Sequence, residues 1–199
     1  MNKSPLSDDS LAQLFTEART YNAWLPTPVA DETLIHLADL MKLGPTAANS
    51  CPARLVFLKS EAAKQRLAPH LSEANRAKTM TAPVVVIIGY DLEFYEQLGF
   101  LFPHNPDARS WFAGNDDAIQ TTAFRSSSLQ GGYLILAARA LGLDCGPMSG
   151  FDNAGVDSTF FPDGQIKSNF ICALGHGDKS HHFHPRGPRL AFADFASIL

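Results

Sequence analysis

A loop of small side chains, two hydroxyls and one amide opens the stretch GPTAANSCPARLVFL, residues 44 to 58. Thr46, Asn49 and Ser50 are its polar members, and Ala47 and Ala48 add little bulk. The apolar run that ends at Leu58 predicts a buried strand directly after the loop. A loop of this kind leaves backbone groups and an amide accessible, which favours a binding loop for something flat or polar.

Arginines near both ends of the chain are candidates for holding an anion. Arg19 is expected to close the first helix and is followed by Thr20, and Arg186 and Arg189 lie in the tail sequence PRGPRL. Guanidinium groups bind phosphate oxygens through two parallel hydrogen bonds. Each of these arginines alone is compatible with an ordinary surface position. Together they could clamp one phosphate if the two ends of the chain meet.

Histidines and cysteines offer weaker signals. His176, His181, His182 and His184 fall close together near the C-terminus, and imidazole is a common metal ligand. Their irregular spacing in a polar tail equally fits solvated loop histidines. The three cysteines are far apart and form no CxxC motif, which predicts buried free thiols in a reducing compartment.

An aromatic segment, FLFPHNPDARSWFAGN at residues 100 to 115, carries two prolines and Arg109. Its length and composition predict a long loop with some local structure, and such loops are often functional. The aromatic side chains either line a pocket or belong to the core. The sequence pattern alone does not decide between a pocket lining and the core.

Periodicity and capping signals predict the elements that must position these residues. Ser7 is expected to cap a first helix that runs toward Arg19, and Asp31 to cap a second helix ended by Gly44 as a C′ glycine. A long helix is expected over 116–141, although its small SSSLQGG segment contains two glycines that each cost about 1 kcal/mol relative to alanine. Strands are expected at 55–58, 84–90 and 169–174, an extended piece at 143–151, and further short helices after Ser60, after Pro69 and before the last strand. This order predicts one α+β domain spanning residues 1–199.

Composition limits the classes of function. The chain has 199 residues, of which 45% are apolar and 18% charged, and a net charge of −4. This balance argues against nucleic acid as a partner, because nucleic-acid binders usually carry a basic stripe. The most apolar run, residues 84–90, is too short to span a membrane, and the N-terminus has no apolar core typical of a signal peptide. We therefore expect a cytoplasmic protein, and the low charge content suggests that a second subunit covers part of its surface.

Four segments together resemble the nitroreductase family of FMN enzymes. They are ART (18–20), GPTAANSCPARLVF (44–57), AARALGLDCGPMSGF (137–151) and RGPRL (186–190), in the family's order and spacing. The stretches FYEQL, LFPHNPDARSWF and IKSNF are most similar to its RutE/HadB-like subgroup. That subgroup is proposed to reduce malonic semialdehyde to 3-hydroxypropionate in pyrimidine degradation.

The resemblance implies a nitroreductase-like α+β fold: a small, mostly antiparallel central sheet flanked by helices, in an intertwined homodimer. It implies FMN bound at the dimer interface, NADH or NADPH as electron donor, and a small aldehyde or enone as acceptor. The cofactor-binding residues that it implies are Arg19, Thr20, Asn22, Pro45, Thr46, Ala47, Asn49, Pro147, Met148, Ser149, Gly150, Arg186 and Arg189.

Specific roles follow from the same resemblance. Arg19 and Arg186 would hold the phosphate, Asn49 would hydrogen-bond the pyrimidine edge of the flavin, and the backbone of residues 148–150 would lie near flavin N5. Arg109 is a candidate contact for a substrate carboxylate, with a surface position as its alternative.

Three positions depart from the family pattern. Asn22 stands where many relatives carry a second basic residue, Cys51 replaces a common Gln, and Ala53 replaces Trp. Fewer positively charged side chains would then hold the phosphate, and the substrate preference would differ from that of relatives with the usual pattern. Rival functions are a general NAD(P)H nitroreductase or quinone reductase, a flavin-binding protein of the same fold, and a non-enzymatic interaction protein.

Overall fold

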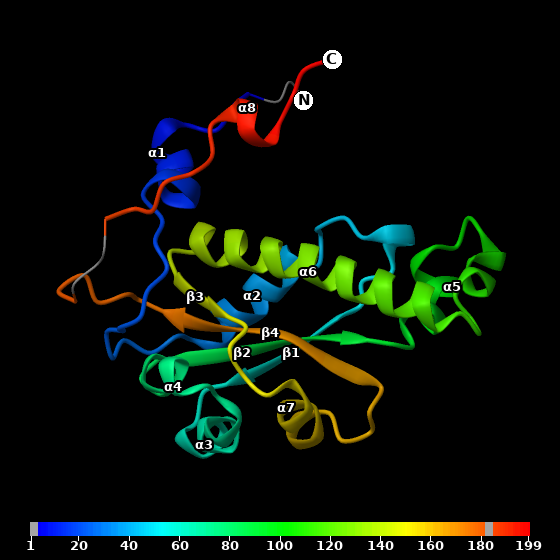
Figure 1. Ribbon diagram of the computed structural model, residues 1–199, viewed down its shortest axis with the longest axis horizontal. Coiled ribbons are helices and arrows are strands. Elements are labelled where there is room, and N and C mark those ends of the chain that lie inside the picture. Colours follow the sequence, from blue (N-terminus) through cyan, green and yellow to red (C-terminus); the bar gives the residue numbers. More distant parts are fainter. Residues whose placement is uncertain (1–3, 182–184) are drawn as a thin grey trace.

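A four-stranded antiparallel sheet forms the centre of the computed structural model, which describes residues 4–181 and 185–199 (Figure 1). Its strands are β1 (Ala53–Leu58), β2 (Val84–Asp91), β3 (Asp144–Met148) and β4 (Ile166–Gly175), in the order β1-β2-β4-β3. All three strand pairings are antiparallel. The fully buried β2 lies in the middle because its run of β-branched side chains suits burial on both faces.

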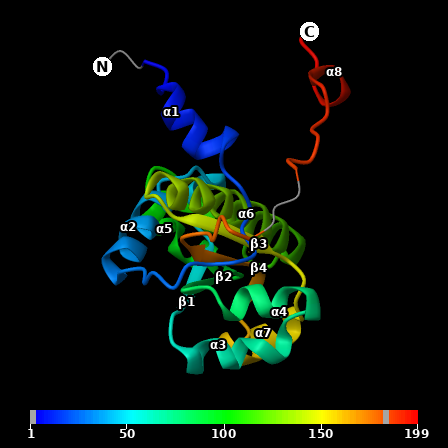
Figure 2. The ribbon, with the colours of Figure 1, turned by 90° about the vertical axis from the view of Figure 1, so that its left-hand side faces the viewer.

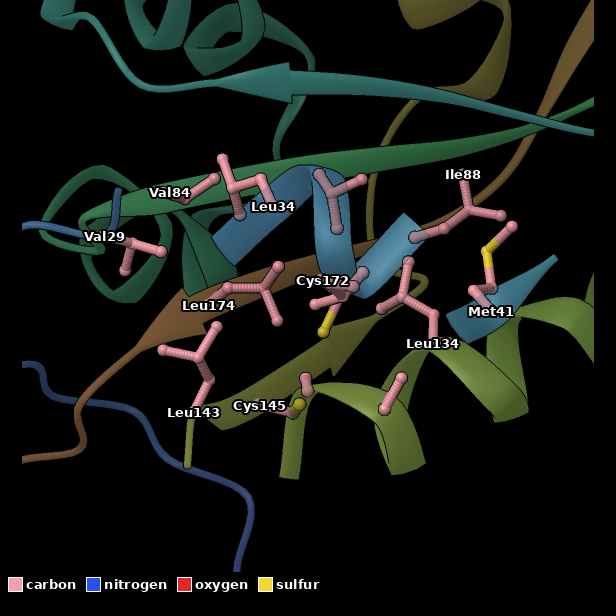
Figure 3. Close-up of a cluster of buried hydrophobic side chains, with 14 residues drawn as sticks. Val29, Leu34, Met41, Val84, Ile88, Leu134, Leu143, Cys145, Cys172 and Leu174 are labelled. Atoms are coloured by element: carbon pink, nitrogen blue, oxygen red, sulfur yellow. The ribbon is translucent and has the colours of Figure 1, made fainter. Parts of the chain in front are cut away.

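Helices cover both faces of the sheet. Figure 2 shows α2 (Asp31–Met41) and α6 (Asp116–Ala140) on one side, and α3 (Glu61–Leu67), α4 (Glu73–Met80) and α7 (Asn153–Phe160) on the other. Alternate residues of β2 pack against the two helical layers, because successive side chains of a strand point to opposite faces of the sheet. Val84 and Ile88 pack with α2 and α6 in the cluster of Figure 3, whereas Val85 and Ile87 pack with α3 and α7.

The small residues of α6 are explained by the neighbours of that helix. The Asn169 amide, at an irregularity in the β2–β4 pairing, donates to the hydroxyls of Ser127 and Ser128 at 2.8 and 2.9 Å. A Cβ on Gly131 would come within 2.4 Å of the Phe170 ring, so only glycine lets the helix approach β4 this closely. These contacts offset the helix-propensity cost of the segment.

The N-terminal helix is shorter than predicted. Ser7 does cap it, but α1 spans only Asp8–Leu11 and continues as a π-helical turn over Ala12–Thr16, so Arg19 lies beyond the helix instead of closing it. None of the residues in these two elements is buried. Without a core-facing stripe, packing does not enforce a regular α-helix there.

Two predicted features of α2 were wrong. Ala30 occupies the N-cap position and Asp31 is the first helical residue, without a side-chain cap. Gly44 is not in the left-handed conformation of a C′ glycine, because the glycines with positive φ are Gly114, Gly142 and Gly164. Gly44 is required for another reason: a Cβ there would lie 2.7 Å from the Tyr133 ring.

The aromatic segment has more regular structure than a loop. It contains the second half of α5 (Leu98–Leu101) and a 3₁₀ helix over Pro106–Trp111, and another 3₁₀ helix over Phe94–Gln97 precedes it. Phe112 is buried in a third apolar cluster with Phe94 of the preceding turn, whereas Phe100 and Trp111 are exposed. Aromatic side chains of this segment therefore serve both the core and the surface.

Both terminal arms project from the same end of the molecule (Figures 1 and 2). The C-terminal arm contains the short helix α8 (Phe192–Phe195). Large apolar side chains on this arm are exposed, among them Phe192, Phe195 and Ile198. Within the described residues, no helix combines the length and the apolar character that a membrane crossing requires.

Candidate functional site

Four arginines meet in one polar hollow of about 390 Å³ at the end of α6. Two come from the tail, one from the segment after the π-helical turn, and one from the last turn of α6. The hollow is lined by Phe15, Ala18, Arg19, Thr20, Arg139, Arg186, Gly187 and Arg189. The structure therefore brings together the three arginines that the sequence singled out and adds Arg139, which it did not.

Hydrogen bonds across the chain build this hollow. Thr20 pairs with Cys145 beside the free edge of β3, where the Tyr21 N–H donates to the Cys145 carbonyl at 3.2 Å. Arg186 Nη2 donates to the carbonyls of Thr16 and Ala18 at 2.6 and 2.9 Å. The two ends of the chain thus meet, which was the condition for a shared anion site.

The hollow has an excess of positive charge. Arg139, Arg186 and Arg189 donate to backbone carbonyls, and none of the three forms an ion pair with a carboxylate of residues 4–181 or 185–199. Guanidinium groups held this way can bind a phosphate dianion at close range. Asn22, by contrast, is exposed in a bend and does not line the hollow.

The segment from Pro147 to Gly150 comprises the last two residues of β3 and the two residues after it. One side chain and one backbone group of the α3–α4 region hold its end, because Asn75 Nδ2 and the Ser72 N–H donate to the Gly150 carbonyl at 3.0 and 3.1 Å. A Cβ on Gly150 would lie 2.6 Å from Asn75 Nδ2. Sequence reasoning missed Ser72 and Asn75, although the polar LSEAN start of α4 was a visible signal.

The loop of small residues is strained. Ala48, Asn49 and Cys51 have φ values of 49°, 50° and 42°, a region that residues with a side chain rarely occupy. Such conformations cost about 1–3 kcal/mol each and cluster at functional sites. The loop persists because the Cys51 N–H donates to Thr46 Oγ1 at 3.1 Å and because Asn49 Nδ2 donates to the Leu101 carbonyl at 2.8 Å.

Polar groups of this loop remain available for a ligand. Asn49 is exposed and Thr46 partly so, whereas Pro45 and Ala47 present open surface. Ser50 Oγ is buried without a hydrogen-bond partner among the described residues. Buried orphan hydroxyls are costly and need an explanation, such as a group bound nearby.

The loop and the arginine hollow lie on different sides of α6. Gln130 Oε1 accepts from the Ala53 N–H at 2.9 Å next to the loop, whereas Arg139 lines the hollow. Nine residues of α-helix separate these positions by about 14 Å along the axis and by about two and a half turns. In Figure 1, α1 lies by the C-terminal end of α6, and α5, to which the loop is bonded, lies by its other end.

Comparisons with known proteins match this chain almost end to end. The nitroreductase family model matches residues 4–176. A Burkholderia lata protein named as a candidate NADH dehydrogenase/NAD(P)H nitroreductase is 63% identical to this chain. The match covers 97% of this chain and 98% of that protein. HadB of Ralstonia pickettii, similarly named, is 58% identical over 95% of this chain and 97% of its own. The chain belongs to the nitroreductase family.

A solved structure confirms the nitroreductase-like α+β fold. A nitroreductase of Exiguobacterium sibiricum, crystallised in complex with FMN, superposes with a TM-score of 0.86 over 99% of this chain and 100% of its own, at 19% identity. The identity is low enough that the likeness shows the fold alone. The family model and the close relatives confirm the family to which the four sequence segments pointed.

Arg109, the candidate substrate contact in this family member, is paired with a carboxylate. Its Nε and Nη2 donate to the two Glu96 oxygens at 2.8 and 2.6 Å, and its guanidinium lies over the Tyr95 ring. The Arg109 hydrogen bonds hold the pKa of Glu96 below its usual value. Glu96 occupies the Nε and Nη2 side of the guanidinium, so a substrate carboxylate would have to replace Glu96 or bind through the remaining N–H donors.

The remaining candidates do not form a second centre. His181 pairs with Asp178 at 3.1 Å, while His182 and His184 lie outside the described residues. No metal-ligating group of three or more His, Cys, Asp or Glu occurs in the described part of the chain. Cys145 and Cys172 are buried free thiols as expected, but Cys51 is only half-buried because it lies in the strained loop.

Proposed function

We propose that this chain is an FMN-dependent NAD(P)H oxidoreductase that works as a homodimer and reduces malonic semialdehyde to 3-hydroxypropionate. One observation carries the proposal: an arginine-rich hollow and a strained amide loop lie on different sides of α6. A ligand with a phosphate at one end and a flat polar ring at the other would reach both through a second copy of the chain.

The residues present fit FMN. Arg19, Arg186 and Arg189 would hold the phosphate, with the Thr20 hydroxyl beside them. The segment from Pro147 to Gly150 continues from this hollow along β3, so it would meet the ring of the same cofactor. Thr46, Ala47 and Asn49 of the partner copy would supply the pyrimidine-edge contacts.

Bound FMN would supply the hydride chemistry between NAD(P)H and the acceptor. The chain's own contribution is to bind the phosphate, orient the ring and exclude water. Arginines achieve the first by charge-assisted hydrogen bonds. Ser72 and Asn75 serve orientation, because they fix the carbonyl of Gly150 and with it the backbone at the end of β3.

An exposed apolar face on α6 supports the second copy. Phe124, Leu129 and Tyr133 are each 40–50% exposed and share one side of the helix with Gly132, whose missing Cβ would meet nothing within 4 Å. Contiguous apolar patches of this kind mark interaction sites. The apolar side chains of the C-terminal arm are likewise exposed and would find cover on a partner.

The acceptor rests on the resemblance to the RutE/HadB-like subgroup, which the identity to HadB supports. The alternative, a general NAD(P)H nitroreductase or quinone reductase, is supported by the names of the relatives. The expected cytoplasmic location and the role in pyrimidine degradation stay predictions.

Stopped-flow measurements on the purified, FMN-loaded protein test this function. NADH and NADPH should each be tried as reductant, followed by reoxidation with malonic semialdehyde, a neutral quinone and a nitroaromatic. Fast reoxidation by malonic semialdehyde supports the proposed acceptor, whereas reaction with only the other two favours a general reductase. A flavin that neither nicotinamide reduces would contradict an oxidoreductase, and a protein that binds no FMN would contradict the whole proposal.

Sedimentation tests the dimer. Leu129→Glu places a charge on the exposed face of α6 and should shift the protein toward monomer and release flavin. Leu25→Glu, a substitution of a similarly exposed leucine elsewhere, is the matched control. A wild-type monomer with full FMN occupancy would contradict the shared site.

A further inference from the structure

Arg139 is the arginine of the hollow that neither the family resemblance nor the motifs assigned. It lies in the last turn of α6, more than a hundred residues from the N-terminal segment and about fifty from the tail. We infer that Arg139 binds the phosphate of the cofactor and supplies the positive charge that Asn22 lacks. This inference rests on the proposed function.

The charge count motivates it. The family pattern that the sequence resembles implies a basic residue at the position of Asn22, whereas Asn22 is neutral and exposed outside the hollow. Arg139 restores a fourth guanidinium from a different element. A phosphate dianion gains from each added guanidinium because the attraction is stronger at a partly buried site than in bulk water.

The hydrogen-bond geometry leaves Arg139 able to bind a ligand. Its Nη1 donates to the Leu14 carbonyl at 2.7 Å, and no other side-chain donor of Arg139 has a partner among the described residues. A guanidinium has five N–H donors in a planar fork. One nitrogen therefore anchors the side chain, and the others remain for an anion in the hollow that Arg139 lines.

Arg139 also has a purely structural role that must be separated from binding. Its contact with Leu14 holds the π-helical turn, and a cation at the C-terminal end of α6 interacts favourably with the helix dipole. The same two segments are joined a second time, because Gln13 Nε2 donates to the Arg139 carbonyl at 2.6 Å. Gln13 is uncharged, so it offers a matched control for the structural role.

The experiment compares FMN with riboflavin, which has the same ring but no phosphate. Fluorescence titration should give an FMN affinity about tenfold to hundredfold lower for Arg139→Gln, the effect of losing one hydrogen bond to a charged group. Riboflavin affinity should stay within about twofold. Arg139→Lys, which keeps the charge, should recover most of the FMN affinity, and Gln13→Ala should leave the ratio of the two affinities unchanged.

Salt gives a second readout. The wild-type preference for FMN over riboflavin should shrink as ionic strength rises, because salt screens charge attraction at accessible sites. It should shrink less in Arg139→Gln. A structural role does not predict this difference, and circular dichroism will show whether each variant is folded.

The outcomes separate the inference from the proposed function. Equal losses of affinity for FMN and riboflavin in Arg139→Gln would overturn the inference, as would the same losses of affinity in Gln13→Ala. Either result would mean that Arg139 has only a structural role. An unchanged FMN affinity would overturn it as well. If the wild-type protein binds neither flavin, the proposed function itself fails and the inference falls with it.

Discussion

Arg54 and Asp91 form an ion pair with a 2.5 Å separation between Nη2 and Oδ2 at the base of the strained loop. Arg54 Nη1 also donates to the Cys51 carbonyl at 3.1 Å, so the pair fixes the last residue of the loop. Asp91 Oδ1 accepts from Gln165 Nε2 at 2.9 Å and from the Glu93 N–H at 2.8 Å, which ties the pair to the sheet. The loop conformation therefore depends on contacts outside the loop.

Arg54→Met should cost more stability than Asp91→Asn. The Asp91 side chain is 5% exposed, so its charge would be left buried, whereas Arg54 is 34% exposed and can reach water. We expect Arg54→Met to lower the free energy of unfolding by about 2–3 kcal/mol, less than the 3–5 kcal/mol typical of breaking a fully buried ion pair. Urea unfolding measures this loss, and Lys42→Met, which breaks an exposed pair with Asp39, is a control expected to lower the free energy of unfolding much less.

Flavin binding should respond to the same variant. The loop is proposed to contact the flavin ring and not the phosphate. Arg54→Met should therefore lower the affinities for FMN and for riboflavin to the same extent. A loss confined to FMN would show that the loop acts on the phosphate end instead.

Arg19→Ala should show the opposite selectivity. Removing one charge-assisted hydrogen bond should lower FMN affinity about tenfold to hundredfold, while riboflavin binding and the thermal midpoint change little. Fluorescence titration measures both flavins, and Arg66→Ala, an arginine bonded to the Thr159 carbonyl on the other face, is the control. Unchanged FMN affinity would remove Arg19 from the site.

The pair of Arg109 and Glu96 should govern carboxylated acceptors. Glu96→Gln frees the guanidinium and should speed reoxidation of the flavin by malonic semialdehyde, whereas Arg109→Ala should slow it. Reoxidation by a neutral quinone, measured by stopped flow, should change in neither variant. Equal effects on both acceptors would mean that the pair is structural.

The pH dependence of this pair has a definite sign. Hydrogen bonding to Arg109 lowers the pKa of Glu96 in the folded state, so the pair's stabilisation is present above the unfolded Glu pKa. It is lost as the pH falls through the lowered, folded-state pKa. The wild-type protein should therefore keep the pair closed at neutral pH, and only acid should make its acceptor preference approach that of Glu96→Gln.

The two neighbouring glycines of α6 should respond differently to alanine. Gly131→Ala places a methyl group against the Phe170 ring and should destabilise the fold by about 1–3 kcal/mol, as overpacking does. Gly132→Ala meets no neighbour and should raise helix stability by about 1 kcal/mol in the isolated chain. Thermal unfolding separates the two, and a stabilised Gly131→Ala would contradict the close packing of α6 on β4.

Local patterns in the sequence were enough to place most elements. The apolar run at Val84 to Tyr90, the short helix expected after Ser60 and the long helix expected over 116–141 appear in the structure as β2, α3 and α6. These signals are local because side-chain alternation, helix caps and left-handed glycines each depend on a few neighbouring residues. The four family segments likewise identified the nitroreductase family without any structure.

The tertiary structure decided which distant residues share a site. Arg139 enters the hollow and Gly44 makes room for Tyr133 because α6 packs where it does, and Asn49 bonds to Leu101 because α5 lies beside the loop. Local periodicity could not predict these contacts, since each joins residues far apart in the chain. The shortened first helix shows the same dependence, because a helix without buried side chains lacks the packing that would extend it.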